Sequence, residues 1–138
     1  IHIYFVGKMK TIFTNGCFDV LHRGHLELLK YCRSLGQKVI VGINSDESVR
    51  RLKGPDRPIV SQEDRRALLE ELKCVDQVFI FEEDTPYELI QMTKPDIIVK
   101  GGDYSPKEVV GNDLAEVVIF ETIDGYSSTK IIEVASNR

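Results

Sequence analysis

The sequence predicts a doubly wound α/β domain in which helices cover both faces of a parallel five-stranded sheet. Five short apolar runs rich in β-branched residues recur along the chain, each bounded by Gly, Pro, Asn or Asp. Such nearly continuous runs are typical of strands buried on both faces of a parallel sheet. Segments with helical spacing separate them, so strand and helix alternate. This alternation indicates βαβ units with right-handed crossovers, and hence the fold class.

Each element is predicted from local signals. The expected strands cover residues 10–16, 38–44, 75–81, 95–101 and 115–121. The expected helices cover residues 25–36, 61–73 and 85–94, and a last helix follows Ser127. Gly36 is a C-terminal helix signal, Ser61 is a preferred N-cap, and Pro86 suits a first turn. The segment 50–60 is basic and contains one Gly and two Pro residues, which predicts a loop.

Length, charge and cysteine content narrow the class of protein. The 138 residues are enough for one domain with its own core. The net charge of -4, without a block of Lys and Arg, argues against extended binding to nucleic acid. No apolar run approaches the ~20 residues that span a bilayer, so no membrane segment is expected. Three cysteines without CxxC spacing favour reduced thiols in a cytoplasmic protein.

The first residues are not expected to belong to the domain. The opening run IHIYFVG is too short for the apolar region of a signal peptide. Met9 directly precedes the first expected strand. We therefore interpret residues 1–9 as an N-terminal extension, or as residues left from cloning, and residues 10–138 as the domain.

The residues that carry chemistry follow four of the five expected strands. In a doubly wound sheet, ligands bind in the crevice beyond the carboxyl ends of the strands. The turns that converge there carry His22, His25, Lys53, Lys100, Asp103, Ser127, Ser128 and Thr129. Imidazole, ammonium and hydroxyl groups at one edge predict a pocket for phosphates. The chain has neither the G-x-G-x-x-G fingerprint nor a P-loop, so a nucleotide must be held in another way.

His22 and His25 lie three apart, where the first strand gives way to the first helix. Residues at this spacing share a helix face, and the first turn offers unpaired N–H groups and the positive end of the dipole. Gly24 between them lets a phosphate approach the backbone closely. A helix-cap feature and a zinc site are the alternatives, but no third metal ligand follows at recognisable spacing. We interpret the pair as an anion site.

The string GCFDVLHRGH, residues 16–25, resembles the HxGH signature of the cytidylyltransferase-like nucleotidyltransferase superfamily. These enzymes join a nucleoside triphosphate to a phosphomonoester and release pyrophosphate. The resemblance runs from about Lys10 to the C-terminus. The strings VKGGDY and FEEDTP are most similar to adenylyltransferases that act on D-glycero-D-manno-heptose 1-phosphate in lipopolysaccharide-core precursor synthesis. The resemblance implies a Rossmann-like nucleotidyltransferase fold, ATP as substrate, a sugar phosphate as acceptor, a bridging Mg²⁺ and a homodimer.

The resemblance also implies roles for individual residues. Those assigned to the phosphates and the transition state are His22, His25, Lys53 and Arg65. Those assigned to the nucleotide are Asn15, Gly16, Cys17, Phe18, Asp19, Gly24, Lys100, Gly101, Asp103, Tyr126, Ser127, Ser128 and Thr129. No metal-ligating side chain is predicted, because Mg²⁺ keeps several waters and needs few protein ligands. For Asp19, Arg65 and Ser127 the alternative interpretations are a turn-fixing residue, a solvated charge and an N-cap.

Three other functions fit parts of the sequence. Cytidylyltransferases that act on glycerol 3-phosphate or choline phosphate share the HxGH turn but carry an Arg-Thr-Glu-Gly-Ile-Ser-Thr string near their end. Here residues 122–129 read TIDGYSST, without the Arg and the Glu, which favours ATP over CTP. FAD synthetases of the same superfamily resemble the first two-thirds of the chain. A nucleotide-binding regulatory module without turnover is the non-enzymatic alternative.

Overall fold

The sheet has the five parallel strands that the sequence predicts. The computed structural model describes residues 9–121 and 127–137. The strands, in the order β3-β2-β1-β4-β5 across the sheet, are β1 (Thr11–Gly16), β2 (Lys38–Asn44), β3 (Gln77–Phe81), β4 (Ile97–Gly101) and β5 (Glu116–Phe120). Every neighbouring pair is parallel. The winding reverses at β1, which has β2 on one side and β4 on the other, and this confirms the doubly wound fold.

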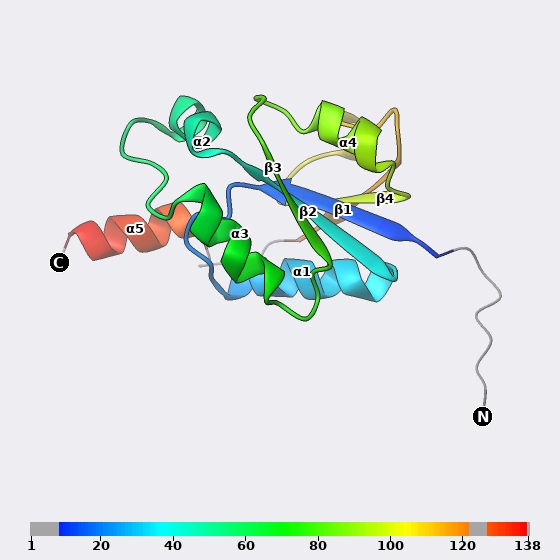
Figure 1. The fold of residues 1–138 in the computed structure, drawn as a ribbon, viewed down its shortest axis with the longest axis horizontal. Coiled ribbons are helices and arrows are strands. Elements are labelled where there is room, and N and C mark those ends of the chain that lie inside the picture. Colours follow the sequence, from blue (N-terminus) through cyan, green and yellow to red (C-terminus); the bar gives the residue numbers. More distant parts are fainter. Residues whose placement is uncertain (1–8, 122–126, 138) are drawn as a thin grey trace.

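Helices cover both faces of the sheet, as predicted (Figure 1). They are α1 (Arg23–Leu35), α2 (Asp46–Lys53), α3 (Gln62–Glu70), α4 (Tyr87–Thr93) and α5 (Ser128–Ser136), with a 3₁₀ turn η1 (Pro106–Glu108). In Figure 1, α1 and α3 lie below the sheet and α4 lies above it, whereas α2 and α5 gather where β1 and β2 end. In the described part of the chain, no helix is both long and apolar enough to cross a membrane.

Alternate residues of the central strand pack on opposite faces of the sheet. On β1, Ile12 packs with Leu29 of α1 and Leu69 of α3 in one apolar cluster. Its neighbour Phe13 packs with Leu89 of α4 in the other cluster. This is the two-residue period of a strand. Because apolar side chains fill both faces, polar side chains that serve a ligand are left to the ends of the strands.

Two carboxylates close the amino ends of the strands. Asp76 accepts hydrogen bonds from the backbone N–H of Val39 at 2.7 Å and from Arg33 of α1 at 2.7 Å. Asp96 accepts one from the backbone N–H of Thr11 at 2.8 Å. These contacts satisfy backbone donors that the sheet itself leaves unpaired. The amino edge is therefore built for stability, and the opposite edge is the one available for chemistry.

The three predicted helix signals, Ser61, Gly36 and Pro86, all lie at helix ends. Gly36 and Pro86 do so in a different way than predicted. The hydroxyl of Ser61 caps α3 and accepts the backbone N–H of Asp64 at 3.3 Å. Gly36 follows the last residue of α1 in extended rather than left-handed conformation. A Cβ on it would lie 2.6 Å from the carbonyl oxygen of Lys10, so close approach requires the glycine. Pro86 is the N-cap of α4 and not a member of its first turn.

The predicted loop 50–60 is wrong at its start, because its first four residues complete α2. The hydroxyl of Ser45 caps this helix and accepts a backbone N–H at 3.1 Å. Acidic residues in the first turn and basic residues in the last complement the helix dipole. Gly54, at φ 110, ends the helix. Lys53 consequently stands on the last turn of a helix and not on a loop.

Candidate active site

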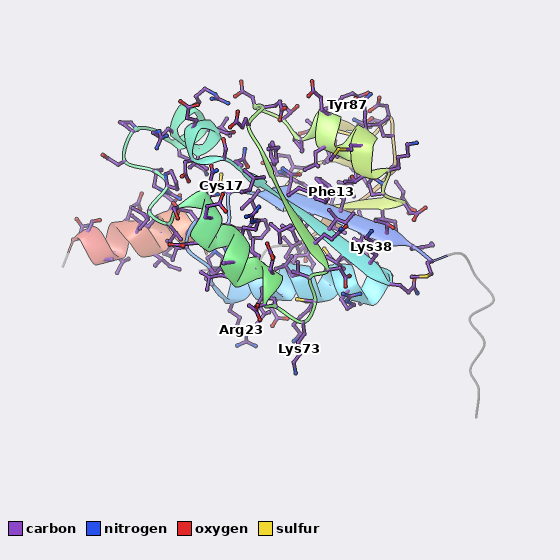
Figure 2. The ribbon with its side chains drawn as sticks, viewed as in Figure 1. Phe13, Cys17, Arg23, Lys38, Lys73 and Tyr87 are labelled. Carbon is purple, nitrogen blue, oxygen red and sulfur yellow. The ribbon has the colours of Figure 1, made fainter. Side chains whose placement is uncertain are left out.

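Two adjoining cavities open at the carboxyl edge of the sheet. The histidine cavity, of about 300 Å³, is lined by these predicted site residues: Asn15, Cys17, Phe18, Asp19, His22, His25, Lys53, Lys100, Gly101, Ser127, Ser128 and Thr129. The loop cavity, of about 500 Å³, has walls from the segments after β3 and β4, among them Asp84, Thr85, Tyr104 and Glu108. Both cavities share Asn15, Cys17, Lys53 and Lys100. Cys17, labelled in Figure 2, marks this junction just beyond β1.

The two histidines form a fixed pair at the start of α1. His22 is the N-cap and His25 the third residue of the helix. The backbone N–H of His22 donates to Nδ1 of His25 at 3.3 Å, which leaves the proton of a neutral His25 ring on Nε2. The rings stack with centroids 3.8 Å apart, and the ring of Phe18 lies 4.9 Å from that of His25. The structure confirms the helix-cap interpretation of the pair, and the anion-site interpretation stays a prediction.

The backbone before the pair is strained. Phe18 has φ 49, in the left-handed region that residues other than Gly and Asn rarely adopt. Its ring is buried against the core cluster beneath α1. Strain of this kind persists where the surroundings hold it, and it concentrates at functional sites. Here it directs the chain from β1 into the turn that carries the histidines.

Burial keeps both histidines neutral near pH 7. It lowers the pKa of His25 to about 4, with a further contribution from the neighbouring His22, and it also lowers the pKa of His22. Neutral rings bind phosphate oxygens through N–H donors and carry no net charge. The positive charge of the site must therefore come from other residues.

Replacement of His25 by Asn is expected to make the protein less sensitive to acid. The wild-type ring, with a pKa of about 4 when folded and 6.5 when unfolded, takes up its proton only on unfolding between these values. The resulting destabilisation is absent above pH 6.5, grows as the pH falls and is complete below pH 4. From pH 7 to pH 5 the wild type should lose on the order of 1–2 kcal/mol more unfolding free energy than the variant. Urea unfolding at both pH values measures this, and equal losses would contradict a buried neutral ring.

Cations concentrate at the junction of the two cavities. Lys53 at the end of α2 and Lys100 on β4 line both cavities, and Arg57 lines the histidine cavity. Burial lowers the pKa of Lys100, and the nearby charge of Lys53 acts in the same direction. The ammonium of Lys100 also lies 5.2 Å from the centre of the Tyr104 ring. An anion bound between the lysines would relieve their mutual repulsion, so the junction favours a phosphate.

Comparison with known proteins identifies the family. Residues 13–134 match the family described as cytidylyltransferase-like. The chain belongs to this family of nucleotidyltransferases. The match begins within β1, covers β2 to β5 and includes most of α5. It confirms the resemblance drawn from residues 16–25.

Relatives of this nucleotidyltransferase include longer proteins named bifunctional protein HldE. The one from a Nitratiruptor species is 59% identical over 125 residues, which is 90% of this chain and 27% of the relative. The one from a Helicobacter pylori strain is 57% identical over 127 residues, 91% of this chain and 28% of the relative. The chain thus spans little more than a quarter of these relatives. The crystal structure of the lipopolysaccharide core biosynthesis protein from Thermoplasma volcanium has a TM-score of 0.75 at 28% identity, covering 85% of this chain and 100% of that one.

Asp19 of this nucleotidyltransferase holds a loop in place. Its buried carboxylate accepts hydrogen bonds from Nε of Arg57 at 2.6 Å and from the backbone N–H groups of Ile59 and Val60 at 2.9 Å. Although burial alone raises the pKa of Asp19, these hydrogen bonds hold that pKa below its ordinary value. Arg57 also donates to Oγ1 of Thr129 at 3.3 Å. These contacts support the turn-fixing interpretation of Asp19, and they fasten the loop after α2 to both the HxGH turn and α5.

Arg65 differs most from its predicted role. Its side chain is 1% exposed and lines neither cavity. It donates to the carbonyl oxygens of Val60 at 2.9 Å and of Cys17 and Asn44 at 2.8 Å, and to the carboxylate of Asp46 at 2.8 Å. Four of the five N–H donors of the guanidinium are thus engaged within the protein. The position of Arg65 outside both cavities gives no support to the predicted phosphate contact, which stays a prediction. Arg65 instead joins the ends of β1 and β2 from beneath the site.

Three other predicted residues, among those that the structure describes, do not line the histidine cavity. Gly16 lines the loop cavity only. Gly24 and Asp103 line neither cavity. Asp103 is exposed, and its assignment to the nucleotide stays a prediction. Tyr126 lies outside the described residues.

The start of α5 uses its hydroxyls within the protein. Ser127 is the N-cap, and its side chain accepts the backbone N–H of Lys130 at 3.0 Å. The hydroxyl of Ser128 donates to the carbonyl oxygen of Val20 at 2.8 Å. The N-cap interpretation of Ser127 is therefore confirmed. Both residues still line the histidine cavity, so the first turn of α5 forms one of its walls.

Sequence reasoning missed Arg57 and most of the loop cavity. Arg57 lies in a basic segment whose sequence gives no sign of which cation turns inward. Asp84, Thr85, Tyr104 and Glu108 follow β3 and β4. Their position just after strands is the signal that could have found them.

Proposed function

We propose that the chain transfers AMP from ATP to a sugar phosphate, a heptose 1-phosphate or a close analogue, and releases pyrophosphate. The reaction would supply nucleotide-sugar precursors for the lipopolysaccharide core. The observation that carries the proposal is the junction of two cavities at Lys53 and Lys100, with the paired histidines in one of them. The names of the relatives, HldE and a lipopolysaccharide core biosynthesis protein, support the choice of pathway. The homodimer and the cytoplasmic location stay predictions.

In this proposal the histidine cavity receives the triphosphate. The first turns of α1 and α5 both border the cavity and present backbone N–H groups and positive dipole ends. The Nε2–H of His25 is the donor that its tautomer leaves for a phosphate oxygen. Arg57 lies in the same cavity. Together these groups would hold the leaving pyrophosphate.

The acceptor phosphate would enter from the loop cavity and meet the nucleotide between the two lysines. One of its oxygens attacks the α-phosphorus in line, the bond from that phosphorus to the β-phosphate oxygen breaks, and pyrophosphate leaves. No covalent enzyme intermediate forms. Placement and neutralisation of charge dominate reactions of this kind. Cys17 needs no nucleophilic role, and burial raises the pKa of its thiol.

Mg²⁺ would accompany the nucleotide and would neutralise part of the charge of its phosphates. Among the described residues, no group of three or more His, Cys, Asp or Glu side chains is arranged to hold a metal ion. Asp19 is the single carboxylate among the described residues that line the histidine cavity, and hydrogen bonds from the protein engage it. The ion would therefore be held by phosphate and water, which Mg²⁺ accepts readily.

ATP is expected to bind at least tenfold more tightly than CTP, a difference of about 1.4 kcal/mol. The segment 122–129 lacks the Arg and Glu of cytidylyltransferases, and a site built for one base edge rejects another whose polar groups it leaves unpaired. Calorimetric titration of both nucleotides with Mg²⁺ measures the preference. Tighter binding of CTP would overturn the adenylyltransferase proposal and leave the family unchanged.

Turnover separates the remaining alternatives. Pyrophosphate release is measured with ATP and a panel of acceptors: a heptose 1-phosphate, glycerol 3-phosphate, choline phosphate and FMN. The proposal expects release with the heptose phosphate and a nucleotide-sugar product of matching mass. Preference for FMN would indicate an FAD synthetase. A regulatory module would bind ATP and release no pyrophosphate with any acceptor.

A further inference from the structure

We propose that Glu108 selects acceptors whose end remote from the reacting phosphate is uncharged and rich in hydroxyls. The inference rests on the proposed function, because it takes the loop cavity as the acceptor site. The inference adds to the proposed function one residue, Glu108, that sets the specificity for the acceptor. The argument comes from the distribution of charge along the loop cavity.

The loop cavity is lined by charges of both signs. Lys53 and Lys100 line both cavities and so lie where the loop cavity meets the histidine cavity. Asp84 and Glu108 line the loop cavity and not the histidine cavity. They come from separate segments, the turn after β3 and the η1 turn after β4. An acceptor with its phosphate between the lysines would extend its other end toward these carboxylates.

The two carboxylates differ in how their charge is balanced. Asp84 pairs with Nε of Arg51 at 3.1 Å. Glu108 accepts a hydrogen bond from the hydroxyl of Ser105 at 3.0 Å, and it makes no ion pair with any residue that the structure describes. The negative charge of Glu108 is therefore the less compensated of the two. Glu108 is therefore the group that would discriminate between acceptors with a charged and an uncharged far end.

An ionised carboxylate only accepts hydrogen bonds. A hydroxyl on the far end of the acceptor satisfies it, whereas a second anion in its place is repelled. The neutral polar side chain of Thr85 lines the same cavity and suits hydroxyls as well. Tyr104 is the single aromatic side chain among the described residues of the lining, and a cage for a quaternary ammonium needs several. The lining therefore favours a polyol over a choline-like end.

The test measures binding, so that it does not depend on turnover. Wild type and Glu108→Gln are titrated with three monophosphates in the presence of a non-hydrolysable ATP analogue. The three monophosphates are a heptose 1-phosphate, the same heptose 1-phosphate oxidised to a carboxylate at its far carbon, and choline phosphate. The wild type is expected to bind the neutral sugar at least thirtyfold more tightly than its carboxylate form, and Glu108→Gln should reduce that ratio by about tenfold, which corresponds to roughly 1.4 kcal/mol.

Glu71→Gln is the matched control, because Glu71 is exposed at the end of α3 and lines neither cavity. The ratio of its affinities for the neutral sugar phosphate and the carboxylate form should equal that of the wild type. An unchanged ratio in Glu108→Gln, or tighter binding of choline phosphate than of the sugar phosphate, overturns the inference. If the ratio shifts as expected while no sugar phosphate supports pyrophosphate release, the inference stands and the proposed reaction fails. Affinity for the ATP analogue, measured alongside, reports whether each variant is folded.

Discussion

His25→Asn is expected to lower the rate of pyrophosphate release by roughly a hundredfold or more, while thermal stability at pH 7 stays close to that of the wild type. An Asn oxygen stands near the position of Nδ1 and can still accept the backbone N–H of His22, so the cap is kept. The donor at Nε2 is lost. Removal of one preorganised donor to transition-state charge typically costs on the order of 3 kcal/mol.

His25→Gln provides the second variant. Its longer side chain can bring an amide N–H near the position of Nε2, and a Gln at the third helical residue can still accept the backbone N–H of His22 through its amide oxygen. We expect part of the lost rate to return, with little change in stability. Steady-state pyrophosphate release and melting temperature are measured for both variants. Wild-type rates in His25→Asn would refute the role of this ring in catalysis.

Arg65→Met is expected to destabilise the folded protein by about 3–5 kcal/mol, the largest effect on stability that we predict. The buried guanidinium donates to three carbonyl oxygens and one carboxylate. Its removal takes a donor from the three carbonyl oxygens, whereas the partly exposed carboxylate of Asp46 still accepts the backbone N–H of Gln62 at 2.8 Å. Arg65→Lys keeps the charge but cannot supply the same fork of donors, so it should recover only part of the loss.

Arg66 offers a matched control on the same helix. Its side chain is 42% exposed and pairs with Glu63 and Glu70 on the helix surface. Such surface pairs contribute little, so Arg66→Met should change stability by less than about 1 kcal/mol. Chemical denaturation at pH 7 measures the free energy of unfolding of Arg65→Met and of Arg66→Met. Similar losses for both variants would mean that the buried network of Arg65 adds nothing beyond helix propensity.

The fold was predictable because its signals are local. Each strand is a short apolar run, and residues such as Ser61 mark helix ends whatever the rest of the chain does. The exception, α2, has only Val49 and Leu52 as large apolar residues, which is too few to show a helical period. Its capping residue Ser45 and its charge pattern were the stronger signals.

The site was predictable only where one segment supplies it. His22 and His25 come from one turn, and their spacing alone indicates the pair. The roles of Asp19 and Arg65 depend on partners up to 48 positions away in the sequence. Adjacent arginines on α3 look alike in sequence, although Arg65 lies four residues before the buried Leu69 and so shares its face. That periodicity contained a signal for burial, but not for what the buried guanidinium would contact.

The central place of β1 means that no shortened version of the domain keeps a whole site. Ile12 and Phe13 pair with Ile97 and Ile98 of β4, far along the chain. A chain that stopped before β4 would leave the apolar edge of β1 open to strands of other molecules. It would also lack Lys100 and the first turn of α5, which complete the histidine cavity. During synthesis, the cavity edge is therefore expected to form only once most of the domain has left the ribosome, and we expect a prematurely terminated chain to aggregate.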